Sequence, residues 1–192
     1  MRKNAKAANF GLIYGMGWRT FQLYAKQNYG IEYSEYEARE TRNKFMNTYP
    51  GIKSLVNHVY DMLQENEINS LNTPEHLYSK NGFVVGRSRA GRGMVSRSPN
   101  DILNFPVQGT GADILKLSSI KFAWSLMENN WEDDVYITNY IHDELLISCK
   151  KEIANEVTET LKSSMNTAFR YLVKEVPILV EGDIGTNWEQ IH

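Results

Sequence analysis

The sequence holds a single cysteine, Cys149, and no apolar run that approaches the length of a membrane span. One cysteine cannot form an internal disulfide or a thiolate metal cluster, so we expect a reducing compartment. Because a bilayer span needs about 18 apolar residues and no signal-type segment follows Met1, we expect no membrane partner. With 42% hydrophobic and 23% charged residues, the composition excludes disordered and fibrous classes and predicts a globular, cytoplasmic protein.

Acidic residues are absent from two stretches of the chain, residues 1–31 and 76–100, although its net charge is -2. Each stretch carries five basic residues, whereas from Glu128 to the end there are thirteen acids and five bases. Two basic segments on a weakly acidic protein suit a polyanion such as nucleic acid. The plainer alternative is that both segments are solvated faces.

Most of the first half of the chain is predicted to be helical, over residues 2–16, 18–30, 35–48 and 51–69. Gly15 and Gly17 are expected to end the first of these helices. Ser34 followed by Glu37 has the spacing of a capping box, and Pro50 suits the first turn of a helix.

The second half mixes hairpins with helices, so the predicted fold class is α+β and mostly helical. Asn81-Gly82 between two β-type runs predicts a hairpin over residues 77–85, and the Arg-rich and Gly-rich residues 86–97 are expected to form a loop. Proline cannot donate a backbone hydrogen bond, so a helix over residues 100–127 should be kinked or started afresh at Pro106. The remaining predicted elements are an antiparallel hairpin over residues 135–149, a helix over 152–174 and a strand over 177–183.

Four side chains recur every four residues near the start of the chain: Arg2, Lys6, Phe10 and Tyr14. On a helix they would form a stripe roughly 18 Å long. Cations match phosphates and aromatic rings stack on nucleobases, so the stripe could align a triphosphate, a sugar and a base. The alternative is a helix with an exposed basic end and a buried aromatic end.

Two further groups carry polar side chains suited to binding or catalysis. Asn104 and Gln108 lie four residues apart, and their amides could donate to minor-groove acceptors that every base pair offers, although isolated amides are commonly helix caps or surface groups. Asp143 and Glu144 at the tip of a predicted hairpin could hold Mg²⁺, which prefers carboxylate and phosphate oxygens. Adjacent acids are common in turns, and His142 beside them is by itself most simply structural.

Three segments together resemble signature motifs of family A DNA polymerases, the group that includes bacterial DNA polymerase I. These segments are RKNAKAANFGLIYG at residues 2–15, similar to the motif B helix of the fingers, NFPVQGTGAD at 104–113, similar to the palm-helix signature, and IHDEL at 141–145, similar to motif C. Their order and spacing match as well. Residues 49–51 and 182–188 resemble two further family segments, so the resemblance covers the whole chain.

The resemblance implies fingers helices over residues 1–75 and part of the palm over residues 76–192, with motif C on an antiparallel β-hairpin. Arg2 and Lys6 would then bind the incoming triphosphate, and Lys6 would also act as a general acid toward the leaving pyrophosphate. Phe10 would pack on the sugar, and Tyr14 would stack beside the templating position.

The resemblance also implies partners for the remaining candidates, a DNA primer-template and Mg²⁺. The implied DNA contacts are Asn104 and Gln108 in the minor groove, His142 near the primer end, and Arg87 and Arg89 on strand phosphates. Asp143 would be a ligand of a two-metal site, with Glu144 beside it in a less defined role. The expected location is the cytoplasm of a bacterial or phage-infected cell.

Two positions depart from the family pattern. Asn100 stands where an arginine is usual four residues before Asn104, so that phosphate contact is lost or taken over by Arg97. Gly17-Trp18 replaces the more usual small polar residue after the first helix.

The family's motif A, a strand with a metal-binding aspartate followed by Tyr-Ser-x-x-Glu, has no match ahead of motif B. Residues 32–37 are similar in sequence to motif A, but they follow motif B and contain the predicted capping box. We therefore expect the C-terminal part of a DNA-directed DNA polymerase, inactive alone and completed by an N-terminal polymerase fragment that carries motif A. The alternatives are part of a phage-type single-subunit RNA polymerase, which Phe10 and residues 142–144 disfavour, and a non-catalytic module that binds DNA or nucleotides.

Overall fold

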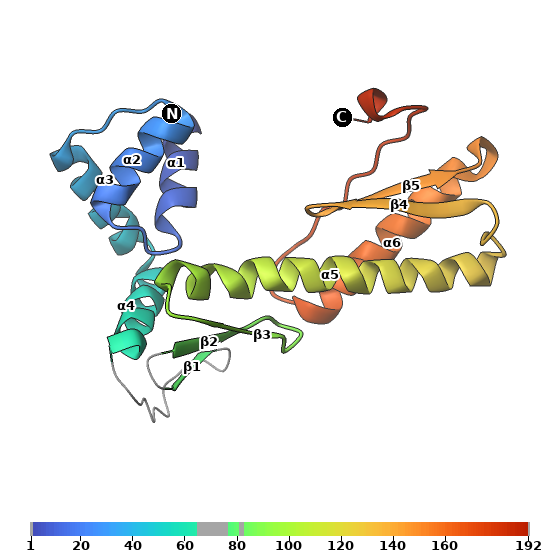
Figure 1. Ribbon diagram of the computed structural model, residues 1–192. Helices are drawn as coiled ribbons and strands as arrows, with labels where there is room; N and C mark the ends of the chain where they lie inside the picture. Colours follow the sequence, from blue (N-terminus) through green and yellow to red (C-terminus); the bar gives the residue numbers. More distant parts are fainter. Residues whose placement is uncertain (1, 65–76, 81–82, 192) are drawn as a thin grey trace. The chain divides into compact units, whose positions relative to one another are not determined.

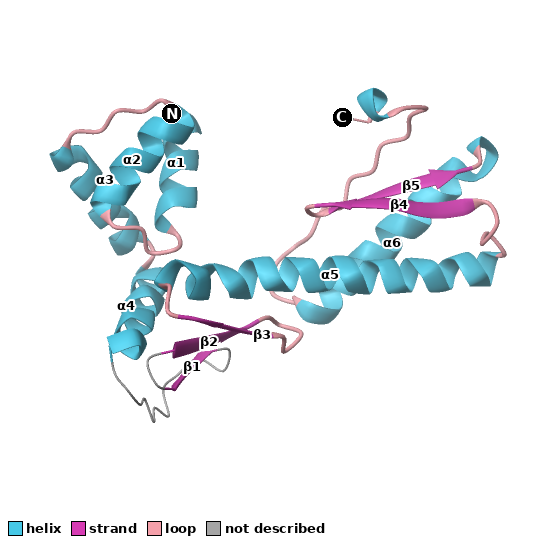
Figure 2. Cartoon of the chain, viewed as in Figure 1, coloured by secondary structure: helices cyan, strands magenta, loops and turns pink. Residues whose placement is uncertain are grey.

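Helices make up most of the chain in the computed structural model, which describes residues 2–64, 77–80 and 83–191 (Figure 1 and Figure 2). Two compact units are present: Met1–Arg87 with Gly91–Pro106, and Ser88–Ala90 with Val107–His192. Each unit contains an antiparallel sheet, of three strands in the first and two in the second. The predicted class, α+β and mostly helical, is confirmed. A boundary between fingers and palm near residue 75 stays a prediction.

Four helices open the first unit: α1 (Arg2–Leu12), α2 (Trp18–Tyr29), α3 (Glu35–Thr48) and α4 (Pro50–Gln64). Ala7 and Gly11 are buried on one face of α1, and a Cβ at Gly11 would lie 2.9 Å from a ring carbon of Phe21 in α2. The capping box before α3 is confirmed, because Ser34 accepts from the Glu37 N–H and the Glu37 carboxylate accepts from the Ser34 N–H at 2.8 Å. That pairing uses two of the residues that give residues 32–37 their similarity to motif A.

The first helix ends earlier than the predicted residue 16. Leu12 is its last residue, and the Gly15 N–H donates to the Leu12 carbonyl at 3.0 Å in the turn that follows. Gly15 has a φ of 80°, a left-handed conformation that favours glycine. A Cβ at this position would also lie 3.0 Å from Val56 and 3.1 Å from Leu103, so the chain turns where only glycine fits. Tyr14 therefore lies outside the helix.

The first unit also contains a sheet in the order β1 (Leu77–Lys80), β2 (Phe83–Arg87) and β3 (Gly93–Ser96). Lys80 pairs with Phe83, as expected for the predicted hairpin. The turn residues 81–82 of this hairpin lie outside the described residues. The predicted end of the fourth helix near residue 69 lies outside them as well. The prediction of a loop over residues 86–97 is wrong. Val85 pairs with Val95, and Gly91, with a φ of 85°, permits the turn between these strands.

The long helix α5 (Pro99–Asn129) begins in the first unit and continues in the second. The helix continues through Pro106, so the predicted alternative of a new helix that starts at this proline is wrong. Ile102 and Leu103 before the proline belong to the core of the first unit, so burial offsets the missing backbone hydrogen bond. In the part of the chain that the structure describes, no helix is both long and apolar enough to cross a bilayer.

The second unit joins most of α5 to β4 (Val135–Ile141), β5 (Glu144–Cys149), the short η1 (Lys151–Ile153), α6 (Ala154–Leu172) and η2 (Trp188–Gln190). Phe122 and Leu126 of α5, Val135 of β4 and Val157 of α6 form its buried core. The hairpin and the helix over residues 154–172 are as predicted. The strand predicted over residues 177–183 is wrong, because among the described residues this segment pairs with no other strand.

Candidate nucleotide and DNA interface

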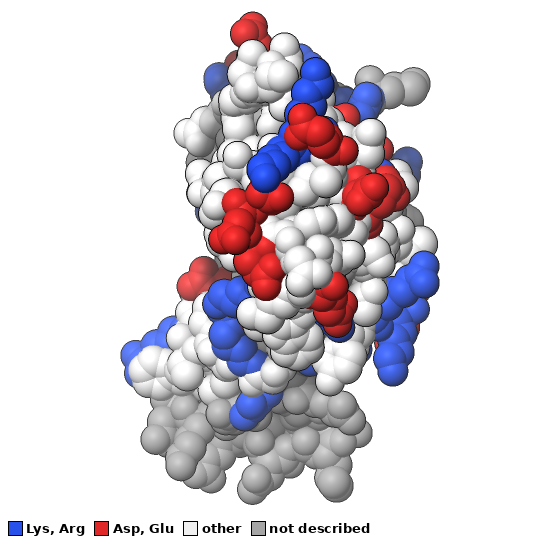
Figure 3. Space-filling view, turned by 90° about the vertical axis from the view of Figure 1, so that its right-hand side faces the viewer, with Lys and Arg blue, Asp and Glu red and all other residues white. Residues whose placement is uncertain are grey.

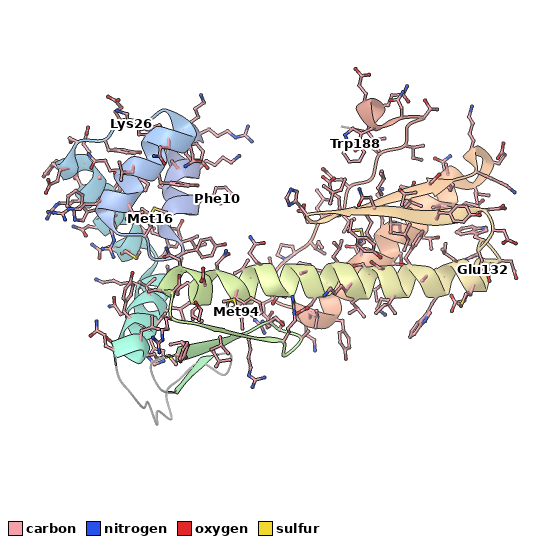
Figure 4. All side chains as sticks on the ribbon, in the orientation of Figure 1. Phe10, Met16, Lys26, Met94, Glu132 and Trp188 are labelled. Carbon is pink, nitrogen blue, oxygen red and sulfur yellow. The ribbon has the colours of Figure 1, made fainter. Side chains whose placement is uncertain are left out.

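The open face of α1 carries Arg2, Lys6 and Phe10. All three side chains are exposed, and 55% of the Phe10 surface is accessible to water. Figure 4 shows Phe10 on α1. The Lys6 Nζ lies 5.9 Å from the centre of the Phe10 ring, within reach of a cation–π contact. Because Ala7 and Gly11 turn the opposite face of the helix toward the interior, the packing of α1 determines which side chains remain open.

Tyr14 does not continue this line as a helical residue. Its side chain is half-buried and packs against the core of the first unit. The alternative interpretation was a helix whose basic end is exposed and whose aromatic end is buried. It holds in part for Tyr14, which is half-buried, but not for Phe10, which is exposed. The stripe is helical as far as Phe10 and ends in a turn.

The two amides of α5 differ in their surroundings. Gln108 is exposed, whereas Asn104 is half-buried and its Oδ1 is buried without a hydrogen-bond partner among the described residues. A buried polar atom without a partner costs about 1–3 kcal/mol, so such atoms occur where a ligand or another group supplies the bond. Asn104 thus offers an unsatisfied polar group at a predicted DNA contact.

Arg87 and Arg89 are exposed, but each already has a protein partner. The Arg87 Nη1 donates to the Gly91 carbonyl at 3.2 Å, and the Arg89 Nη1 lies 3.8 Å from the Glu175 carboxylate. The pKa of Glu175 lies below its usual value, because its own backbone N–H donates to the carboxylate and Arg89 lies nearby. An exposed pair of this kind contributes little free energy, so a phosphate can compete for the arginine. Acidic and basic side chains are also intermixed on the face shown in Figure 3.

The tip of the second hairpin carries three exposed candidates. Ile141 pairs with Glu144, so His142 and Asp143 form the turn between β4 and β5. His142 has a φ of 52°, which histidine adopts more readily than β-branched residues do. Carboxylate oxygens on an open turn suit a hard cation. Within residues 2–64, 77–80 and 83–191, no group of three or more His, Cys, Asp or Glu side chains is placed to hold a metal ion.

The predicted site residues belong to both units. The first contains Arg2, Lys6, Phe10, Tyr14, Arg87 and Asn104, and the second contains Arg89, Gln108, His142, Asp143 and Glu144. A direct contact joins Lys6 to Phe10, and the hairpin tip groups the three residues of motif C.

A polar pocket of about 300 Å³ lies between α3 and α4 and was not predicted from the sequence. Its lining includes Arg42, Asn43 and Asn47 of α3 and Lys53 and Asn57 of α4. The helical spacing within each group was a possible signal. The pairing of the two helices depends on tertiary packing, which no local pattern revealed.

Comparisons with known proteins agree with the motifs. The family model for DNA polymerase family A matches residues 1–190. DNA polymerase I of Aquifex aeolicus is 38% identical over 187 residues, which cover 97% of this chain and 30% of the relative. DNA polymerase I of Caldicellulosiruptor bescii is 31% identical over 192 residues, covering 98% of this chain and 20% of the relative. The chain thus spans less than a third of the length of these relatives.

A solved structure has a similar fold. The polymerase domain of Pol1 from M. smegmatis, in complex with a DNA primer-template and a dNTP, matches with a TM-score of 0.63 and 21% sequence identity. The match covers 87% of this chain and 27% of that one.

Proposed function

Because the chain belongs to DNA polymerase family A, we propose that it is the part of a template-directed DNA polymerase that binds the incoming deoxynucleoside triphosphate and the primer-template. The observation that carries the proposal is the open face of α1, where Arg2, Lys6 and Phe10 are exposed along one line. A phenyl ring that is 55% exposed beside a lysine ammonium is a surface that a nucleotide can cover.

On this face the two cationic side chains and the aromatic ring would contact different parts of the nucleotide. The Arg2 guanidinium can bind phosphate oxygens through two parallel N–H bonds, and Lys6 adds a compact positive charge. Four residues, or about 6 Å of rise along the helix, separate Lys6 from Phe10, so a nucleotide with its phosphates at Lys6 places its sugar on the ring. When the bond from the α-phosphorus to the primer 3′-oxygen forms and the bond to pyrophosphate breaks, Lys6 would give a proton to the pyrophosphate.

The remaining candidates would hold the DNA. Asn104 and Gln108 would meet minor-groove acceptors, His142 would lie near the primer end, and Arg87 and Arg89 would contact strand phosphates. Minor-groove acceptors are nearly the same for every base pair, so these contacts would respond to pairing geometry and not to sequence.

Asp143 would hold Mg²⁺, with Glu144 beside it. Their exposed carboxylates at the tip of the hairpin are the hard oxygen ligands that this cation prefers. When bound, two such ions supply charge stabilisation to the attacking and leaving oxygens of a phosphoryl transfer. The described residues place no third ligand of this kind beside them. As the family resemblance implies, we assign the second aspartate to a motif A segment that lies outside residues 1–192.

Primer extension in Mg²⁺ tests the proposal. We expect no extension by the 192-residue chain alone, and extension when it is mixed with a polypeptide that supplies the rest of a family A polymerase. Asp143→Ala should abolish extension by the mixture. Asp133→Ala, which removes another exposed acid of the second unit, should leave the rate close to that of the wild type.

Three outcomes would contradict the proposal. Extension by the Asp143→Ala mixture would remove this residue from the metal site. Extension by the isolated wild-type chain, lost in Asp143→Ala, would show that an internal acid replaces motif A. Nucleotide and DNA binding without extension by any mixture would instead favour the non-catalytic binding module.

A further inference from the structure

The pocket between α3 and α4 is lined by none of the residues assigned a role above. Its volume is about 300 Å³, near the lower limit for small-ligand sites. Buried Met46 and Val56 are the apolar side chains of its lining, and polar side chains make up the rest: Arg42, Asn43, Asn47, Lys53 and Asn57. Both apolar side chains are almost fully buried, so the accessible lining of the pocket is polar.

The charges of this pocket favour an anion. Its lining contains two cationic residues, Arg42 and Lys53, and no carboxylate. The Arg42 Nε–H donates to the Met16 carbonyl at 3.2 Å, which anchors the guanidinium and leaves the N–H groups of its two Nη atoms as further donors. Lys53 is exposed and has no ion-pair partner in the part of the chain that the structure describes, unlike Lys26, which pairs with Glu32 at 2.7 Å.

We propose that this pocket binds one nucleotide of a single-stranded nucleic acid, whose phosphate is contacted by Arg42 and Lys53. The surrounding amides of Asn43, Asn47 and Asn57, which both donate and accept, would bond to base edges of any sequence. A concave site of about 300 Å³ admits one unstacked base and excludes a paired one, which is why a single strand fits and a duplex does not. The inference rests on the proposed function, because a template-directed enzyme meets an unpaired template, but it uses none of the residues assigned there.

Salt-dependent binding of a short oligothymidylate to the full chain, followed by fluorescence anisotropy, tests the inference. Lys53→Ala should weaken binding about tenfold at low salt. It should also reduce the slope of log affinity against log salt by about 0.7, the value for one lost single-strand phosphate contact. The matched control is Lys44→Ala, which removes an exposed α3 lysine outside the pocket lining and should have little effect on either quantity.

A second variant and a competition experiment distinguish binding in the pocket from general attraction between charges. Asn47→Asp keeps both cations but adds a carboxylate to the lining, and it should weaken binding by a similar factor. Thymidine monophosphate should displace the oligonucleotide at lower concentration than inorganic phosphate does, because only the nucleotide carries a base.

Equal effects of Lys53→Ala and Lys44→Ala on binding would overturn the inference, because they would show that the oligonucleotide is held by general electrostatic attraction and not by the pocket. Inorganic phosphate that competes as well as thymidine monophosphate would overturn it too, because the base would then contribute nothing. Either result leaves the proposed function intact, since primer extension that depends on Asp143 is measured separately.

Discussion

Phe10→Tyr tests the open face of α1 most directly. A dideoxynucleotide lacks the 3′-hydroxyl, and the bare phenyl ring gives it no polar partner in place of that group. The wild-type enzyme, completed by the polypeptide with motif A, should therefore discriminate against dideoxynucleotides. Tyrosine adds a hydroxyl that can occupy the gap, as the family resemblance also implies. Because Phe10 is 55% exposed, the added oxygen should leave the fold unchanged.

The size of the effect follows from one hydrogen bond. A hydrogen bond to a charged group contributes about 1.5–3 kcal/mol, which corresponds to roughly 10- to 150-fold in a ratio of efficiencies. A normal nucleotide fills the same place with its own hydroxyl, so its kcat/KM should change by less than about threefold. Nearly all of the change should therefore fall on the dideoxynucleotide.

The measurement is the ratio of kcat/KM for a deoxynucleotide to that for its dideoxy analogue, in the completed enzyme. Phe83→Tyr is the matched control, because it adds the same hydroxyl to a 39% exposed ring of β2 and should leave the ratio unchanged. An unchanged ratio in Phe10→Tyr would mean that this ring does not face the sugar. The assigned register of Arg2, Lys6 and Phe10 would then be refuted.

Three further predictions concern DNA binding and stability. Replacing Arg87 and Arg89 by alanine should weaken DNA binding and flatten its salt dependence, measured by titration at several ionic strengths; an unchanged slope would exclude phosphate contacts. Ser34→Ala should lower the free energy of unfolding by about 1 kcal/mol in chemical denaturation. The capping box holds the pKa of Glu37 below its usual value through hydrogen bonds from the Ser34 side chain and backbone. Its stabilisation should thus be present above the unfolded pKa of about 4.3 and decline as pH falls through the folded pKa, a loss absent in Glu37→Gln. Gly11→Ala should destabilise by about 1–2 kcal/mol despite the better helix propensity of alanine, because the new methyl group would lie 2.9 Å from a buried ring; equal or higher stability would contradict that packing.

Local signals in the sequence determined most elements and the segments that carry the motifs. The capping box of Ser34 and Glu37 forms as predicted, because it needs only residues three apart. The strands on either side of Asn81-Gly82 pair in the expected register, and the β-type runs around His142 and Asp143 form the second hairpin. Each of these features depends on neighbours a few residues away, so a single sequence is enough to predict it.

Features that depend on distant partners required the tertiary structure. β3 forms within the predicted loop because β2 is available to pair with it, and the apolar pattern of residues 177–183 yields no strand because no partner lies beside it among the described residues. The end of α1 at Leu12 likewise depends on Val56 and Leu103, which leave room only for a glycine at the turn.

The same distinction holds for the candidate site. The spacing of Arg2, Lys6 and Phe10 could be read from the sequence, but their exposure could not. At Phe10 that exposure follows from the burial of Ala7 and Gly11 on the other face of α1, where Gly11 packs closely against Phe21, whereas the first turn of the helix is exposed on all sides. A helix has the same periodicity whichever face is buried, so only packing against other helices determines which side chains remain open to a ligand.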